Sequence, residues 1–432
     1  MNETHDANLK SWLESANDPA SDFPIQNLPF GVFSTEGKRR CGVAIGDQIV
    51  DVSRVADLFT GGAKEVARGC SGEILNPVMA QPDANLSAFR AQLSAMLSTE
   101  TKRRVALEEA LVPMADATLH LPADVGDYTD FYASIYHATN VGKLFRPDNP
   151  LLPNYKHVPI GYHGRASSLV PSGTEIVRPS GQTRPSEKEP PKFGPSAALD
   201  YEAEVGFFVG APNALGAPVP IDEASAHIFG FCLVNDWSAR DIQSWEYQPL
   251  GPFLAKNFAT TVSPWVVTRE AVEPFRVPAF LRPEGDPKPL SYLSSEREEK
   301  EGGLDLTIEV LIRTSIMREG GLRAARISRA SFSDMYWTTA QMLAHHASNG
   351  CNLRSGDLLA SGTVSGPEDG QQGCLLEITR RGAVPLQLPT GEERKFLHDG
   401  DEVILRGWFE REGCARIGMG ECSGTVVARY SS

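Results

Sequence analysis

Twenty consecutive residues, DYTDFYASIYHATNVGKLFR (127–146), combine acidic, aromatic, basic and imidazole side chains. Asp130, Tyr132, His137 and Arg146 all fall within this segment. A core segment would not need the charges, and a solvated loop would not need the aromatic rings, so the mixture is typical of the wall of a polar site. His137 is a candidate general base because an imidazole accepts a proton near neutral pH, although a single histidine can also be purely structural.

Three further carboxylates occur in segments that read as strands. Glu202 and Glu204 in YEAEV are two positions apart, so on a strand they share one face. Asp236 follows the apolar run FCLVN. If these residues converge with Asp130 they need a partner, because two charges about 4 Å apart repel by about 4 kcal/mol at an effective dielectric of about 20. Oxygen ligands without nearby His or Cys favour Ca²⁺ or Mg²⁺, and the alternative is a solvated strand face.

The segment 235–265 carries cationic and amide donors among aromatic residues and Gly-Pro turns. Arg240 and Gln243 are three positions apart and would share one face of a helix, and Lys256 follows in the same segment. Donors of this kind, aimed at one point, stabilise a developing oxyanion or bind a carboxylate. A surface helix with ordinary charges is the alternative. Glu377, flanked by apolar residues in LLEIT, could orient a histidine base as the carboxylate of a catalytic triad does.

Before residue 120 the pattern predicts a small β-rich domain with one or two helices. Strand-like runs flank Gly46-Asp47, a pair that is typical of a hairpin turn. Good helix formers at helical spacing fill 85–111, and a strand with an exit linker is expected at 117–127. The expected strands of this part are FGVFS (30–34) and the two halves of CGVAIGDQIVDVSRV (41–55).

After residue 127 the chain is rich in Gly and Pro and contains many short apolar runs with little helix between them. This pattern favours a rolled or barrel-like mixed β domain over a βαβ sheet. One helix is expected at 332–350, with Gly350 as its C-terminal stop, whereas 178–196 and 285–303 look irregular. Strands are expected at 199–210, 228–236, 263–268, 304–314, 373–382 and 401–410.

The overall composition limits the classes of protein and partner. A chain of 432 residues predicts two domains, and an apolar content of 41% supports a sizeable core. The net charge of −14 disfavours nucleic acid as a partner. No apolar run approaches the roughly 20 residues of a membrane span, and no apolar stretch opens the chain. The seven cysteines are scattered without a C-x-x-C, so reduced thiols and a cytoplasmic location are expected.

Several long motifs, taken in order, resemble those of the fumarylacetoacetate hydrolase family. They are GDYTDFY, HATNVG, GYHGRASS, NDWSARDIQ, PLGPFLAK, HHASNGCNLRSGDLLASGT and DGDEVIL, and the resemblance covers about residues 120–428. It implies hydrolysis of a carbon–carbon bond of 4-fumarylacetoacetate to give fumarate and acetoacetate, the last step of tyrosine and phenylalanine catabolism. The alternative on the same scaffold is a related dioxo-acid hydrolase, decarboxylase or isomerase, such as an acylpyruvase. A Ca²⁺-stabilised scaffolding protein is the non-enzymatic alternative.

The resemblance also implies a fold, cofactors and roles for individual residues. The fold would be mainly β, α+β, with a small SH3-like β-barrel domain with helices at 1–120 and a mixed β-roll catalytic domain at 121–432. The enzyme would be a cytoplasmic homodimer that uses Ca²⁺ and Mg²⁺. The Ca²⁺ ligands would be Asp130, Glu202, Glu204 and Asp236, and a Mg²⁺ site would be lined by Asp236, Lys256 and Thr260. The base would be His137 with Glu377, the oxyanion donors would be Arg240, Gln243 and Lys256, and the substrate would contact Tyr132, Arg146, Tyr162, Arg240, Gln243, Tyr247 and Thr363.

Overall fold

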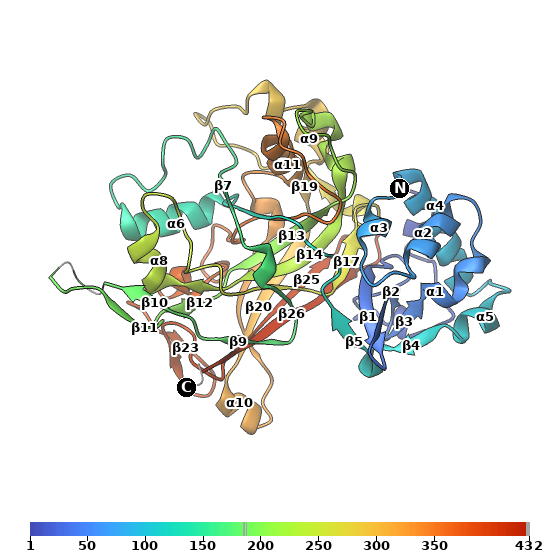
Figure 1. Ribbon diagram of the computed structural model, residues 1–432, viewed down its shortest axis with the longest axis horizontal. Helices are drawn as coiled ribbons and strands as arrows, with labels where there is room; N and C mark the ends of the chain where they lie inside the picture. The colour runs from blue at the N-terminus through green and yellow to red at the C-terminus, as the bar shows by residue number, and fades with distance from the viewer. Residues whose placement is uncertain (185, 187, 429–432) are drawn as a thin grey trace.

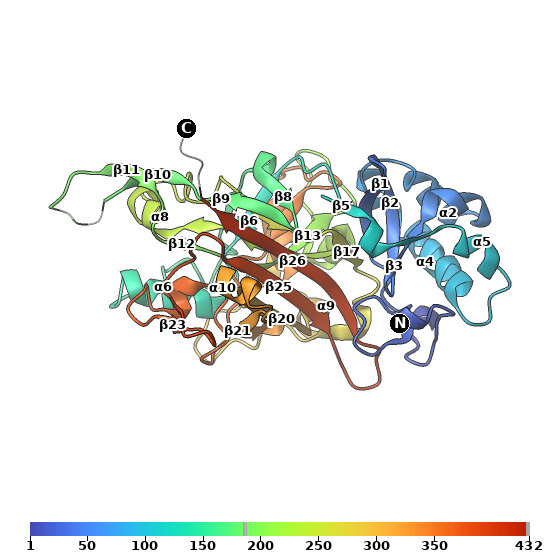
Figure 2. The same cartoon turned by 90° about the horizontal axis from the view of Figure 1, so that it is seen from below.

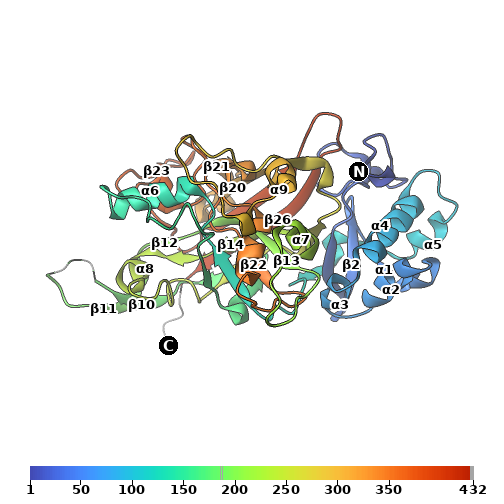
Figure 3. The same ribbon diagram turned by 90° about the horizontal axis from the view of Figure 1, so that it is seen from above.

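The computed structural model of the chain describes residues 1–184, 186 and 188–428. The N-terminal helices lie at one end of the long axis of the molecule, and helix α6 (Ile135–Phe145) lies at the other end (Figures 1 and 3). The strands between these two ends carry Asp130, Glu204 and Asp236, whereas most of the other candidate residues lie on short helices and loops.

The N-terminal part is built on an antiparallel β-meander. Strands β1 (Phe30–Thr35), β2 (Lys38–Ile45) and β3 (Gln48–Asp51) are joined by tight turns, and Gly46 takes a φ of 56° in the turn predicted at Gly46-Asp47. The other elements of this part are α1 (Val52–Val55), α2 (Gly62–Gly69), α3 (Asn76–Met79), α4 (Asp83–Leu97), α5 (Arg104–Glu108), β4 (Leu111–Pro113) and β5 (Thr118–His120).

The larger C-terminal part consists mostly of short strands. Its first half contains β6 (Tyr128–Phe131), α6, β7 (Gly161–His163), β8 (Leu169–Pro171), β9 (Thr174–Val177), β10 (Ser180–Thr183), β11 (Lys192–Pro195), β12 (Leu199–Asp200), β13 (Ala203–Val209), α7 (Ile221–Ala224), β14 (Ile228–Asp236), β15 (Ser238–Ala239), α8 (Arg240–Glu246), β16 (Thr260–Val262) and β17 (Trp265–Thr268). Its second half contains β18 (Arg276–Val277), α9 (Glu296–Glu301), β19 (Gly303–Leu304), β20 (Leu306–Arg313), α10 (Ser315–Glu319), β21 (Ala325–Ser331), α11 (Thr339–Ala347), β22 (Leu358–Ala360), α12 (Leu375–Ile378), β23 (Leu386–Gln387), β24 (Glu393–Arg394), β25 (Glu402–Phe409) and β26 (Ile417–Val427).

One large mixed sheet runs through both parts of the chain. Its hydrogen-bonded order is β4-β3-β2-β1-β17-β14-β13-β22-β6-β7, with β5, β8 and β16 attached beside this path. The N-terminal meander joins it through β1 and β17, where Phe30 lies opposite Val266. Strand β13 pairs with β14 on one side and β22 on the other, and β22 pairs in parallel with β6. The sheet therefore brings the acidic segments of β6, β13 and β14 into one neighbourhood.

A second sheet, in the order β21-β20-β25-β26-β9, packs on the first (Figure 2). The main core contains Phe207 and Phe231 from the large sheet and Ile308 and Leu405 from the second sheet, all fully buried or nearly so. Apolar faces of two sheets that pack on each other exclude water from the space between them. The predicted mainly β, α+β class, with a small N-terminal part before a larger C-terminal part, is confirmed.

The structure corrects two predictions of irregular chain. Segment 178–196 contains a hairpin of β10 and β11, in which Ser180 lies opposite Pro195. Its strands, SGQT and KFGP, lack the apolar alternation by which a strand is recognised. Segment 285–303 contains helix α9, whose N-cap Ser295 accepts a hydrogen bond from the backbone N–H of Glu298.

Two predicted elements also differ from those observed. The helix expected at 332–350 begins only at Thr339, because the Thr338 side chain caps the backbone N–H of Gln341 and the Gln341 side chain bonds back to Thr338. The strand expected at 373–382 is wrong, since this segment contains the short helix α12.

Candidate active site

Four carboxylates from three strand regions converge in the interior. Asp130 on β6, Glu202 just before β13, Glu204 on β13 and Asp236 at the end of β14 each place an oxygen within 4.8 Å of the others. None of these residues is more than 5% exposed. The strand expected at 199–210 is interrupted between β12 and β13, yet Glu202 and Glu204 both reach the cluster, as their spacing predicts.

Two of these carboxylates are neutralised by buried cations. The Lys256 ammonium contacts Glu202 and lies 2.9 Å from Asp236 Oδ2, and Arg240 Nη1 lies 2.7 Å from Glu202 Oε1. Burial alone would raise the pKa of Glu202, but the charges of Lys256 and Arg240 outweigh it and lower that pKa. Asp236 also accepts hydrogen bonds from the hydroxyls of Thr260 and Tyr162, at 2.7 and 2.8 Å.

Asp130 and Glu204 form no ion pair within the described part of the chain. Asp130 Oδ1 and both carboxylate oxygens of Glu204 are buried there without a hydrogen-bond partner. Burial, and then the charge of Asp236, raises the pKa of Asp130 well above its ordinary value, and burial with the charge of Asp130 does the same to the pKa of Glu204. Unpartnered carboxylate oxygens are the ligands that Ca²⁺ and Mg²⁺ prefer, so the cluster fits a divalent cation.

Stability should therefore depend jointly on the cation and on pH. A carboxyl whose pKa is raised by folding stabilises the fold below its unfolded pKa, and this contribution is lost as the pH rises through the folded value. In metal-free protein, Asp130 and Glu204 should thus weaken the fold at neutral pH more than at mildly acidic pH. We expect Ca²⁺ at about 100 times its Kd to stabilise the protein by about 2.7 kcal/mol at neutral pH and by less in acid.

Thermal melts of chelator-treated protein, with and without Ca²⁺ at the two pH values, measure this dependence. A Ca²⁺-induced rise in Tm that is larger in acid than at neutral pH would contradict it.

His137 and Glu377 form a buried pair beside the carboxylate cluster. His137 is on the first turn of α6, where the Ser134 hydroxyl caps its backbone N–H at 3.2 Å, and its Nδ1 lies 2.5 Å from Glu377 Oε1. A carboxylate at Nδ1 fixes the tautomer in which Nδ1 carries the proton, and this leaves Nε2 free to accept one. The Tyr132 ring packs edge-on against the imidazole at 5.2 Å between centroids.

Three more side chains donate to Glu377. Asn140 binds Oε2 at 2.8 Å, while the Ser365 hydroxyl and the Cys374 thiol bind Oε1 at 2.8 and 3.3 Å. Burial opposes ionisation of this carboxyl, but His137 and these hydrogen bonds outweigh it, so the pKa of Glu377 is lowered. Glu377 therefore remains an anion that accepts hydrogen bonds throughout the neutral range.

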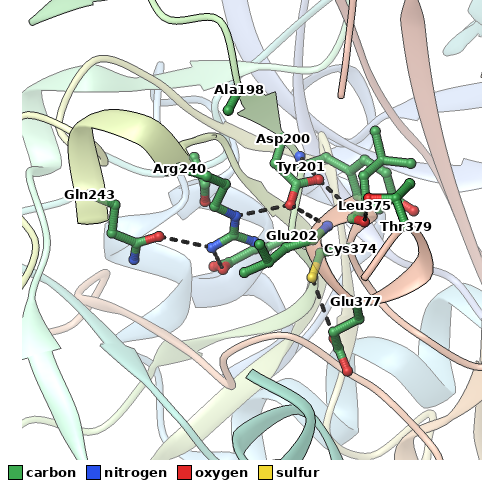
Figure 4. A network of polar contacts seen from close by, with 12 residues as sticks. Ala198, Asp200, Tyr201, Glu202, Arg240, Gln243, Cys374, Leu375, Glu377 and Thr379 are labelled. Carbon is green, nitrogen blue, oxygen red and sulfur yellow. Dashed lines mark hydrogen bonds and ion pairs between the residues drawn. The ribbon is translucent and has the colours of Figure 1, made fainter. Parts of the chain in front are cut away.

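Arg240 is held by carboxylates and by an amide (Figure 4). Its Nε lies 2.9 Å from Asp200 Oδ2, and its Nη1 donates to Gln243 Oε1 at 3.1 Å as well as pairing with Glu202. The i, i+3 spacing of Arg240 and Gln243 on α8 thus brings them together as expected. Arg240 Nη2 is buried and has no partner among the described residues.

One pocket of about 440 Å³ connects these groups. It is lined by eleven of the residues predicted for the site: Asp130, Tyr132, His137, Arg146, Tyr162, Glu202, Arg240, Gln243, Tyr247, Lys256 and Thr363. The other four lie behind this wall: Asp236 and Glu377 bind lining residues, Thr260 donates to Asp236, and Glu204 lies in the carboxylate cluster. Thr363 Oγ1 and Arg146 Nε are buried without a partner in the described structure, so they are available to a ligand.

Several polar residues of the site were not predicted from the sequence. Asp200 stands two positions before Glu202, and the same alternation that linked Glu202 with Glu204 would have predicted it. Asn140 lies three positions after His137, which is the helical spacing that brings two side chains to one face. Cys374 lies three positions before Glu377, so the same spacing indicates it, whereas Ser365 reaches Glu377 only through the fold.

The fold and the pocket define an enzyme in which a buried carboxylate cluster, suited to a cation, adjoins a histidine–carboxylate pair and clustered cationic donors. The chain belongs to the fumarylacetoacetate hydrolase family: the model for the C-terminal part of fumarylacetoacetate hydrolases matches residues 128–427, and the model for the N-terminal part of fumarylacetoacetase matches residues 26–122.

Individual relatives match over nearly their whole length. The fumarylacetoacetase of Bos taurus is 51% identical over 432 residues, which cover 98% of this chain and 99% of that protein. The fumarylacetoacetase of Caenorhabditis elegans is 51% identical over 417 residues, covering 94% and 97%. The structure of a fumarylacetoacetate hydrolase from psychrophilic Exiguobacterium antarcticum aligns with a TM-score of 0.50 at 16% identity, over 93% of this chain and 100% of that one, and shows similarity of fold. None of the helices that the structure describes is long and apolar enough to cross a membrane.

Proposed function

We propose that the protein hydrolyses 4-fumarylacetoacetate to fumarate and acetoacetate, as the last step of tyrosine and phenylalanine catabolism. The supporting observation is that one pocket joins the His137–Glu377 pair, the Arg240–Gln243 donors and the carboxylate cluster. Relatives named fumarylacetoacetase, about half identical over nearly the full chain, support the same substrate. Family membership also favours an enzyme over a scaffolding protein.

The reaction divides into water attack and carbon–carbon cleavage. His137 Nε2 takes a proton from water, and Glu377 holds the opposite ring nitrogen and stabilises the imidazolium that forms. The oxygen of that water attacks the carbonyl carbon on the fumaryl side of the substrate. The electron pair of the carbonyl moves to its oxygen, where Arg240, Gln243 and Lys256 donate hydrogen bonds to the oxyanion.

Cleavage then releases acetoacetate. The tetrahedral oxyanion collapses to the fumarate carboxyl group, and the pair of electrons of the carbon–carbon bond leaves with the acetoacetate carbon as an enolate. The protonated His137 is placed to return its proton to this product. A divalent cation held by Asp130, Glu202, Glu204 and Asp236 would supply positive charge that stabilises the enolate.

We assign the cation and substrate sites as follows. Asp130, Glu202, Glu204 and Asp236 would hold Ca²⁺, and Asp236, Lys256 and Thr260 would line a Mg²⁺ site. Burial alone would lower the pKa of Lys256, but the charges of Asp236 and Glu202 outweigh it and raise that pKa, so the side chain stays cationic. Tyr132, Arg146, Tyr162, Arg240, Gln243, Tyr247 and Thr363 would bind the substrate.

The proposal extends to domains, assembly and location. We place the domain boundary between 1–120 and 121–432, and the two family matches, to residues 26–122 and 128–427, support a boundary near this point. The N-terminal meander, with strands β1 to β5 and its covering helices, would be the SH3-like barrel domain. A cytoplasmic homodimer is expected from the family and from the scattered, reduced cysteines.

The test is the loss of 4-fumarylacetoacetate absorbance with purified protein. Turnover should fall on chelation and return when Ca²⁺ or Mg²⁺ is added back. Parallel assays with acylpyruvates serve as the substrate control. Absence of fumarylacetoacetate turnover in the presence of metal, together with turnover of an acylpyruvate, would replace this function with that of the related hydrolases.

A further inference from the structure

Asp200, at the end of β12, is a fully buried carboxylate that does not line the pocket. It nevertheless accepts four hydrogen bonds. Oδ1 accepts from the backbone N–H groups of Tyr201 at 2.9 Å and Leu375 at 2.8 Å. Oδ2 accepts from the backbone N–H of Leu376 and from Arg240 Nε, both at 2.9 Å. One side chain therefore ties together β12, α8 and α12 (Figure 4).

On one side, Asp200 supplies the cap of α12. The residue before this helix, Cys374, makes no side-chain cap, so the carboxylate of Asp200 satisfies the first two backbone N–H groups, those of Leu375 and Leu376. Glu377 is the next residue of the helix and binds His137. A helix of only four residues has few hydrogen bonds of its own, so its orientation depends on such outside contacts.

On the other side, Asp200 fixes the guanidinium of Arg240. Nε is occupied by Asp200 and Nη1 by Glu202 and Gln243, while Nη2 is left without a partner in the described residues. Three contacts to two of its nitrogens set the rotation of the group, since a guanidinium presents its donors in a fixed fork. The free nitrogen of this pocket-lining residue is thereby kept available to an oxyanion.

We propose that Asp200 is a positioning residue for the reaction: it holds the Arg240 oxyanion donor and the His137–Glu377 pair in a fixed geometry relative to each other. The role rests on the proposed function, because it concerns the separation between the attacking water and the oxyanion donors. Water and donors must both meet the same carbonyl group, and a displacement of about 1 Å can reduce the rate about 10²-fold.

The substitution Asp200→Asn distinguishes a positioning role in the reaction from a contribution to the stability of the fold alone. Asparagine has nearly the same shape, but its amide nitrogen would face N–H donors of Arg240 or α12. We expect kcat to fall about 10²-fold while KM changes by less than about threefold, because the loss is confined to the transition state.

Asp401→Asn is the matched control. Asp401 is also fully buried and binds a single arginine, Arg394, through Nε at 2.7 Å and Nη2 at 2.9 Å, together with the backbone N–H of His398 at 2.8 Å. Neither Asp401 nor Arg394 lines the pocket. We expect Asp401→Asn to lower Tm by an amount similar to Asp200→Asn and to leave kcat within about twofold of the wild type.

Asp200→Glu and Asp401→Glu provide a second pair if an asparagine variant does not fold. Glutamate keeps the charge but moves the oxygens, so Asp200→Glu should also lose kcat and Asp401→Glu should not. Equal kcat in the Asp200 and Asp401 variants, or a fully active Asp200→Glu, would overturn the positioning role. A wild-type enzyme that leaves 4-fumarylacetoacetate intact would instead overturn the proposed function itself.

Discussion

Replacing His137 with asparagine is expected to lower kcat about 10³-fold or more while the protein stays folded and binds metal. The side-chain amide of asparagine can still donate a hydrogen bond toward Glu377, which also keeps Asn140, Ser365 and Cys374 as donors. The asparagine amide cannot accept a proton at neutral pH, so the substitution removes only the general base. Steady-state hydrolysis of 4-fumarylacetoacetate gives kcat, and calorimetric titration with Ca²⁺ gives the metal affinity.

His345→Asn is the control for this substitution. His345 is a half-buried histidine on α11 that contacts the Tyr292 hydroxyl at 3.0 Å and does not line the pocket. Its variant should keep kcat within about twofold of the wild type. A His137→Asn enzyme that retains more than a tenth of wild-type turnover would remove His137 from the role of base.

Glu204→Gln is expected to have opposite effects on metal affinity and on the stability of metal-free protein. Both oxygens of Glu204 are buried without partners in the described structure, and burial with the neighbouring Asp130 charge raises its pKa. Glutamine keeps the shape and removes the charge. Metal affinity should fall about 10²-fold or more, because affinity for Ca²⁺ follows the charge of its ligands.

In the metal-free state the same variant should be more stable than the wild type. Removing an uncompensated buried charge should raise the free energy of unfolding by about 1–3 kcal/mol at neutral pH. Calcium titrations and denaturant melts of chelator-treated protein measure the two effects. Glu309→Gln, on strand β20, changes a glutamate that pairs with Arg326 and Arg329 away from the pocket, and it should leave Ca²⁺ affinity unchanged.

Glu204→Gln protein that binds Ca²⁺ as tightly as the wild type would show that this carboxylate is not a ligand. If the metal-free variant is less stable than the metal-free wild type, the negative charge of Glu204 is balanced by other groups of the fold. Metal affinity and the stability of metal-free protein are measured independently, so either prediction can be contradicted without the other.

Residue spacing in the sequence correctly predicted side-chain positions where the residues are close together in the chain. The alternation of Glu202 and Glu204 predicts a shared face, and both reach the carboxylate cluster. The spacing of Arg240 and Gln243 predicts a shared helical face, and the two side chains are hydrogen-bonded. The resemblance to a family placed the remaining residues, and the pocket brings them together, while their individual roles remain predictions.

The local sequence pattern gave wrong predictions where contacts between distant parts of the chain determine the structure. The apolar run around Leu375 and Leu376 looks like a strand, but it is helical because Asp200, 175 positions earlier, caps its first N–H groups. Ser365 likewise reaches Glu377, twelve positions later, only through the fold. The sequence of a single segment does not predict such contacts, because they depend on how distant strands pack.

The pairing of β1 with β17 has a consequence for how the molecule unfolds. β17 is hydrogen-bonded to β14, and β14 ends at Asp236, so the N-terminal meander and the carboxylate cluster share one continuous ladder. A buried apolar cluster also contains Val32 and Phe89 of the N-terminal part with Phe229 and Val234 of β14. The two family-defined parts should therefore melt as one cooperative unit rather than as separate modules, because opening the meander exposes the back of the strand that carries the active site.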